Sequence, residues 1–141
     1  VYLGTMAILP DYTGLGIGGK LYNKAIEISI NTLNFTKPLF WGLFTSKNAI
    51  KLRKYFKSHS PKDDGSFSKK ELEISENIFS NLTGYSKSID HPFKLINEKS
   101  HFIFSDEIIE NHKKIKHERN IMDTINYDIT KREALIYLLE L

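Results

Sequence analysis

The apolar and polar positions of the first 57 residues predict alternating strands and helices. Val1–Leu9 is almost continuously apolar and ends at a proline, which is typical of a buried strand. Lys20–Leu33 has the spacing of a helix with a wide apolar stripe that packs on a sheet. Pro38–Thr45 is rich in aromatic residues and predicts a second strand, and Lys47–Lys57 predicts a short helix. A right-handed crossover should place the two strands parallel or splayed side by side.

The rest of the chain has weaker patterns. Ser68 and Glu71 have the spacing of a capping box and predict the start of a helix that ends near Leu82. Glu133–Leu141 has alternating apolar positions, which favour a strand over a helix. The remaining stretches are expected as a loop, an irregular segment, a short strand and a polar helix, in that order: Ser58–Phe67, Ser86–Ser100, His101–Phe104 and Asp106–Glu118.

Composition narrows the function classes. The chain has 141 residues, 40% of them hydrophobic and 26% charged, which is ordinary for one globular domain. Because cysteine is absent, disulfides, thiolate metal sites and a cysteine nucleophile are excluded. The net charge of +3 suits an anionic ligand but does not by itself indicate nucleic acid. The five histidines follow no metal-binding spacing, so we expect them on the surface and predict no metal.

The sequence also suggests where the protein works. Its longest apolar run, Pro38–Phe44, is far shorter than the ~20 residues that cross a bilayer, and no signal peptide is visible. We therefore expect a cytoplasmic location and no membrane partner. The chain opens with Val1 inside a predicted strand, which we interpret as a fragment that lacks the N-terminal part of its fold.

A glycine-rich loop between the first strand and the first helix carries the candidate chemistry. Four glycines occur between Gly14 and Gly19. Glycines allow the backbone to approach a ligand closely, and the following helix directs its N–H groups and positive dipole end at the loop. This arrangement is suited to binding a phosphate group. The alternative interpretation is a structural turn in which glycine is needed only for packing.

Two common phosphate motifs fit the loop incompletely. A P-loop would have a serine or threonine after Lys20, but the next residue is Leu21, so the hydroxyl that holds magnesium is missing. Gly14, Gly16 and Gly19 satisfy the dinucleotide-binding pattern, but the second strand lacks the acidic residue that binds ribose.

A third interpretation rests on resemblance. The stretch from Ile8 to Leu21, ILPDYTGLGIGGKL, resembles the acyl-CoA motif of the GNAT superfamily of N-acyltransferases. Gly16, Ile17 and Gly18 match the core of that motif, whereas Thr13 stands where the family has arginine or glutamine. The stretch Asn48-Ala49-Ile50-Lys51-Leu52 is similar to the family's helix after its fifth strand. The resemblance implies an α/β GNAT-like mixed sheet with flanking helices.

The resemblance also implies roles for particular residues. Backbone pairing with the pantetheine arm would involve Met6, Ala7 and Ile8, and Asn48 would lie at the acyl end unless it is only a helix cap. The pyrophosphate would be held by the loop and the start of the helix: Thr13, Gly14, Leu15, Gly16, Ile17, Gly18, Gly19 and Lys20. The family's catalytic tyrosine position falls on Arg53, which makes Tyr55 the candidate general acid, with packing as its alternative role. No general base is evident.

The implied activity is transfer of an acetyl group from acetyl-CoA to a small-molecule or protein amine. Residues 1–57 would form the acyl-CoA-binding core, and residues 58–141 a continuation of the same domain. The alternative is a non-catalytic or decayed acyl-CoA-binding module. A basic nucleic-acid binder using Lys51–Lys62 is a further rival, although that run is typical of a solvated helix face. An open sheet edge at the first strand would favour a homo-oligomer.

Overall fold

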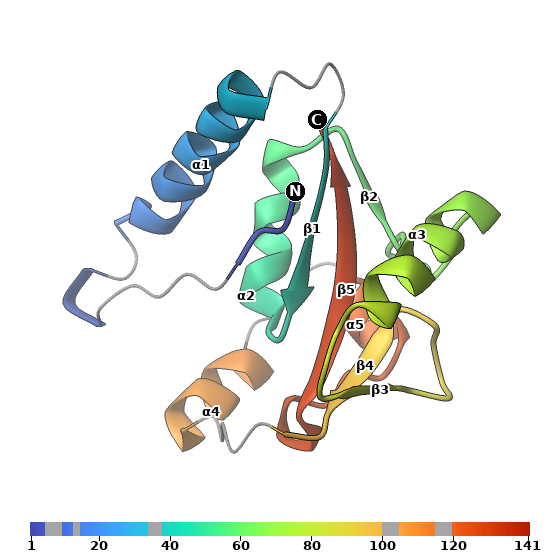
Figure 1. Cartoon of the computed structure of the whole chain (residues 1–141). Helices are drawn as coiled ribbons and strands as arrows, with labels where there is room; N and C mark the ends of the chain where they lie inside the picture. The colour runs from blue at the N-terminus through green and yellow to red at the C-terminus, as the bar shows by residue number, and fades with distance from the viewer. Residues whose placement is uncertain (5–9, 13–14, 34–37, 100–104, 115–119) are drawn as a thin grey trace.

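A mixed α/β fold is built around one antiparallel sheet (Figure 1). The computed structural model describes residues 1–4, 10–12, 15–33, 38–99, 105–114 and 120–141. The sheet has five strands: β1 (Leu39–Phe44), β2 (Ser58–Ser60), β3 (Tyr85–Lys87), β4 (Lys94–Asn97) and β5 (Glu133–Glu140). Their order is β1-β5-β4-β3, and β2 also pairs with β5. Because β1 pairs with β5 along its whole length, β2 and β4 share the opposite edge of β5.

Helices flank this sheet, and in Figure 1 α1 and α3 lie on opposite sides of the strands. The α-helices are α1 (Ile17–Leu33), α2 (Lys47–Ile50), α3 (Lys69–Ser80), α4 (Asp106–Lys114) and α5 (Ile121–Thr124). Three short 3-10 helices complete the described elements: η1 (Pro10–Tyr12), η2 (Lys51–Tyr55) and η3 (Ile129–Lys131). The predicted α/β class is therefore confirmed, as are the helix at α1 and the strand at β1.

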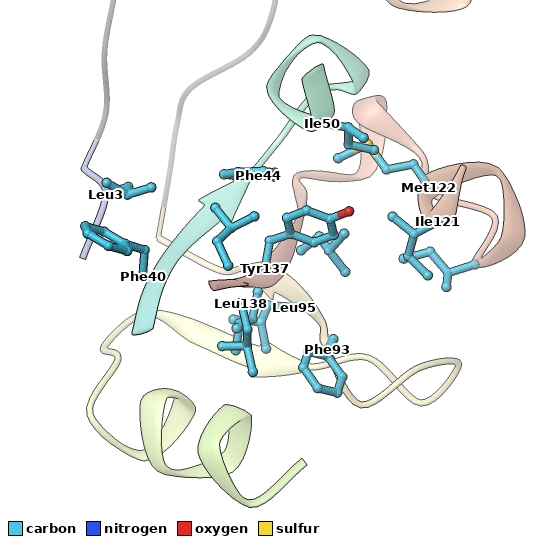
Figure 2. Packing of buried hydrophobic residues seen from close by; sticks show 14 of the residues in the cluster. Leu3, Phe40, Phe44, Ile50, Phe93, Leu95, Ile121, Met122, Tyr137 and Leu138 are labelled. Carbon is cyan, nitrogen blue, oxygen red and sulfur yellow. The ribbon is translucent and has the colours of Figure 1, made fainter. Parts of the chain in front are cut away.

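Strand β5 forms the centre of the core. Every residue from Glu133 to Leu139 is buried, so both faces of this strand are covered. Figure 2 shows Tyr137 and Leu138 of β5 among the buried side chains of the neighbouring elements. A strand buried on both faces has a nearly continuous apolar sequence, which explains why its alternation was weak. The predicted strand at the C-terminal end is confirmed.

The N-terminal residues lie beside β1 in parallel orientation. Tyr2 forms a parallel bridge with Trp41, and the Leu3 N–H donates to the Trp41 carbonyl at 2.7 Å. The Trp41 N–H in turn donates to the Val1 carbonyl at 2.9 Å. The expected parallel neighbour of β1 is thus present at residues 1–3, while residues 5–9 of the predicted strand lie outside the described residues.

Helix α1 uses less of its apolar surface than its sequence predicts. Ile26 is buried, and Tyr22 and Ile30 are half-buried, which gives a narrow contact strip at four-residue spacing. Leu21 and Ile28 are 49% and 54% exposed. The prediction of a wide packed stripe was therefore wrong, because only the side of α1 that carries Tyr22, Ile26 and Ile30 packs against the core.

Two stretches predicted to be irregular contain short strands. Ser58–Phe67 begins with β2, and Ser86–Ser100 contains the end of β3 and all of β4. Strands of three or four residues show no usable periodicity, and these are stabilised by pairing with distant partners. Helices α5 and η3 were not predicted, and His101–Phe104 lies outside the described residues.

The predicted capping box and the polar helix are present. The Glu71 N–H donates to the Ser68 hydroxyl at 3.2 Å, and the Ser68 N–H donates to the Glu71 carboxylate. Helix α3 follows this cap and ends at Ser80, and α4 confirms the polar helix over Asp106–Lys114.

Candidate functional site

The glycine-rich loop leads directly into the N-terminus of α1. Leu15 and Gly16 are exposed, and the first helical hydrogen bond runs from the Lys20 N–H to the Gly16 carbonyl at 3.2 Å. The amides of Ile17, Gly18 and Gly19 therefore precede the helical ladder and form the positive end of the helix dipole. The first turn of α1, which is fully described, contains no acidic residue that would neutralise this end.

Gly16 leaves room in front of this helix end. Its φ of +72° lies in the left-handed region that favours glycine. A Cβ placed on Gly16 would meet no atom of the described residues within 4 Å. A ligand can therefore approach the backbone here, and the residues present fit a phosphate group chemically.

Tyr55, at the end of η2, lies against the first turn of α1. A Cβ built on Gly19 would fall 2.1 Å from the Tyr55 hydroxyl oxygen, so only glycine at position 19 accommodates the tyrosine in this place. The Lys54 ammonium lies 4.9 Å from the centre of the Tyr55 ring. The structure thus brings together Tyr55 and Gly19, two predicted site residues from different elements.

Arg53 has a structural partner, Asp63. Its guanidinium contacts both carboxylate oxygens of Asp63 at 2.5 Å. Beside this pair, the Tyr137 hydroxyl lies 2.8 Å from Nδ1 of His59, and the two rings stack with centres 5.2 Å apart. Burial raises the pKa of Tyr137 above its ordinary value, so the phenol stays protonated. Arg53 therefore belongs to a packed polar cluster under η2.

The turn between β1 and α2 is held by side chains from the C-terminal part of the chain. The Tyr127 hydroxyl donates to the Thr45 carbonyl at 2.6 Å and also lies 2.8 Å from the Glu133 carbonyl. The Lys47 N–H donates to Nδ1 of His112 at 3.3 Å. The Lys47 ammonium forms an ion pair with Asp123 at 2.5 Å.

His112 was not expected in such a position. The sequence predicted surface histidines, but His112 is only 6% exposed. Burial and the nearby Lys47 lower the pKa of His112, which favours the neutral ring that accepts the Lys47 N–H. Because 65 positions separate the two residues, no local pattern could have revealed the contact.

Several predicted site residues lie beyond what the structure describes. Met6, Ala7, Ile8, Thr13 and Gly14 are outside the described residues. The backbone of Asn48 lies in α2, directly after Lys47. Lys20 is exposed on the first turn of α1. The roles assigned to these residues stay predictions.

Two further properties of the described residues bear on function. These residues contain no group of three or more histidine, aspartate or glutamate side chains that is arranged to hold a metal ion. None of the helices in the described ranges has the length and hydropathy needed to span a membrane.

Comparison with known proteins identifies the N-terminal part of the chain. Residues 1–58 match the family described as acetyltransferase (GNAT) family. The matched region contains the glycine loop, α1, β1 and the η2 helix that carries Tyr55. Neither the curated proteins nor the solved structures gave a match. The parallel N-terminal residues and the helix that follows the glycine loop agree with this match, which supports membership in the GNAT superfamily through residues 1–58.

Proposed function

We propose that this protein binds acetyl-CoA and transfers its acetyl group to an amine. The observation that carries the proposal is the start of α1, where exposed Gly16 precedes three amides and a first turn without acidic residues. Membership of residues 1–58 in an acyltransferase family supplies the class of ligand. Acetyl-CoA has a pyrophosphate that suits this helix end, and it supplies the acyl group as a reactive thioester.

The residues of the loop would bind the cofactor mainly through the backbone. The amides of Ile17, Gly18 and Gly19 would donate to pyrophosphate oxygens, and Lys20 would add a positive charge from the exposed face. Met6, Ala7 and Ile8 would pair with the pantetheine arm. Asn48, at the start of α2, would lie at the acyl end. Thr13 would supply a weaker donor than the arginine or glutamine of the family's motif.

Tyr55 fits a cofactor-binding role better than that of general acid. Its hydroxyl lies at Gly19, on the helix end expected to hold the pyrophosphate. In the reaction the amine forms a C–N bond to the acyl carbon and loses a proton, the C–S bond breaks, and the thiolate gains a proton at the opposite end of the pantetheine arm from the pyrophosphate. With Tyr55 at Gly19, its hydroxyl would donate to phosphate, and the proton for the thiolate would come from elsewhere.

A non-catalytic acyl-CoA-binding module is the second candidate. Two observations favour it: Arg53 occupies the aligned tyrosine position and is engaged by Asp63, and Tyr55 lies at the phosphate end. Such a protein would bind acetyl-CoA without transferring its acetyl group.

A two-stage experiment separates these candidates. Calorimetric titration with CoA, ATP and NAD tests the ligand class, and we expect binding of CoA alone, because the loop lacks the magnesium-binding hydroxyl and the ribose-binding acid. Thiol release from acetyl-CoA with a panel of amines then tests transfer. Binding with turnover supports the acetyltransferase, binding without turnover supports the module, and binding of ATP or NAD in preference to CoA would refute both.

A further inference from the structure

We propose that the C-terminal part of the chain positions the acyl end of the cofactor site through three side chains, with His112 as the central positioning residue. This inference rests on the proposed function. The three side chains are His112, Asp123 and Tyr127, which we call the turn clamp. All three lie outside residues 1–58, the region that matches the acetyltransferase family.

The turn clamp makes three contacts with two residues of one short turn, Thr45 and Lys47. Tyr127 holds the Thr45 carbonyl at 2.6 Å, where β1 has just ended. His112 accepts the Lys47 N–H at 3.3 Å, at the first residue of α2. Asp123 holds the Lys47 ammonium at 2.5 Å. Both the backbone and the side chain of the residue before Asn48 are therefore fixed from outside the family region.

The clamp residues are themselves anchored. The Asn120 side-chain amide donates to Asp123 at 2.7 Å, and the Asn120 side-chain oxygen caps α5 by accepting the Met122 N–H at 2.9 Å. Met122 of α5 and Ile50 of α2 are both buried members of the core cluster, and Figure 2 draws their side chains near each other. The His112 and Tyr127 rings have centres 5.7 Å apart. Groups anchored in this way can hold a turn rather than follow its motion.

The chemistry of His112 makes its role sensitive to acid. The neutral ring accepts the Lys47 N–H through Nδ1, which places its own proton on Nε2. A protonated ring has no acceptor, and it would lie near the Lys47 ammonium, with Asp123 and Asp128 as the compensating charges among the described residues. Burial and Lys47 lower the pKa of His112, so the bond persists at neutral pH and is lost in more acidic solution.

The test uses two variants of the full chain that differ in one acceptor atom. His112→Asn keeps an acceptor at the position of Nδ1, whereas His112→Leu fills a similar volume without any acceptor. Adenosine 3′,5′-bisphosphate, CoA and acetyl-CoA are titrated into each protein as probes of the nucleotide end, the pantetheine arm and the acyl end. Tyr127→Phe, which keeps the ring but loses the contacts of the hydroxyl with the Thr45 and Glu133 carbonyls, serves as a second variant if His112→Leu fails to fold.

The expected result is selective. Loss of one buried hydrogen bond should weaken acetyl-CoA binding about fivefold in His112→Leu and leave adenosine 3′,5′-bisphosphate binding unchanged. His112→Asn should bind acetyl-CoA like the wild type at pH 7.5 and should lack the loss of affinity that the wild type shows at acidic pH. Tyr127→Phe should resemble His112→Leu in this selectivity.

Two other results have distinct meanings. Equal affinities of His112→Leu and the wild type for acetyl-CoA, or an equal loss for all three probes, would overturn the positioning role alone. If the wild type bound none of the three probes, the proposed function would fail, and this inference with it.

Discussion

Residues 1–58 and the later residues of this chain contribute differently to the candidate site and to the hydrophobic core. Residues 1–58 carry the glycine loop, yet within their described part few apolar residues are buried: Leu3, Ile26, Phe40, Phe44 and Ile50. The later residues contribute the larger share of the core, namely Phe93, Leu95, Ile121, Met122, Ile125, Ile129 and the apolar residues of β5. Strand β5 also lies between β1 and the other strands of the sheet. The recognisable chemistry and the stabilising core thus come from different parts of the sequence.

This division explains why a family match can cover only part of the chain. The glycine loop acts through backbone amides and depends on local conformation, so its residues stand together in the sequence. The core and the turn clamp act through contacts between residues far apart in the chain, as in the pairing of β1 with β5. Many apolar sequences can meet such packing requirements, provided that volume and pattern are kept.

The largest expected effect tests where the stability lies. Phe93 is fully buried, and Phe93→Ala should reduce the free energy of unfolding by about 3–5 kcal/mol through lost burial and a cavity. Ile28→Ala in α1 is the control, since Ile28 is 54% exposed and its truncation should change stability by less than about 0.5 kcal/mol. Urea unfolding of both variants measures the difference, and equal losses would contradict the division.

A smaller effect tests the contact that joins α1 to η2. A methyl group at position 19 would lie 2.1 Å from the Tyr55 hydroxyl, so Gly19→Ala must displace the tyrosine at a cost of about 1–2 kcal/mol. Tyr55→Phe removes the clashing oxygen and leaves the ring carbon 3.2 Å away. Unfolding of the single and double variants should therefore show coupling, with Gly19→Ala less costly in the Tyr55→Phe background. Strict additivity would mean that the two residues do not touch.

The smallest effect concerns acid stability. Burial lowers the pKa of His91 and of His112 below that of an exposed histidine, near 6.5. As pH falls below 6.5, the unfolded chain gains protons that the folded chain resists, so the free energy of unfolding should decrease until the folded pKa values are passed. Urea unfolding between pH 7.5 and 5 checks this. His91→Gln and His112→Asn should each flatten the profile, and a wild-type profile that rises toward acid would contradict the lowered pKa values of both rings.

Several elements could be predicted from sequence because their signals are local. Helix α1, strand β1 and the capping box of Ser68 and Glu71 were all recognised in this way, although α1 begins at Ile17, three residues before the predicted start. Strands β2 and β4 were not predicted, because three or four residues are too few to show an alternation of apolar and polar positions. Their pairing partner, β5, also lies far along the chain. The burial of His112 was not predicted, because no local sequence pattern distinguishes a buried histidine from an exposed one.

The site itself was predictable only in part. The exposed Gly16 and the helix that follows it agree with the predicted phosphate loop. The position of Tyr55 depended on the 3-10 conformation of Lys51–Tyr55 and on its contact with Gly19, neither of which the sequence indicates. The turn clamp depends on contacts of His112, Asp123 and Tyr127 with Thr45 and Lys47, which lie far away in the sequence.

The most direct test of the central claim is calorimetric titration of CoA into the wild type and two variants of Gly16. Gly16→Glu places a carboxylate at the proposed pyrophosphate position, whereas Gly16→Ala imposes the same backbone strain at φ +72° without the charge. We expect the wild type to bind CoA, Gly16→Ala to bind it somewhat more weakly, and Gly16→Glu to lose about a hundredfold in affinity or more through like-charge repulsion. Equal affinities of Gly16→Glu and Gly16→Ala for CoA would contradict the assignment of this loop as the cofactor site.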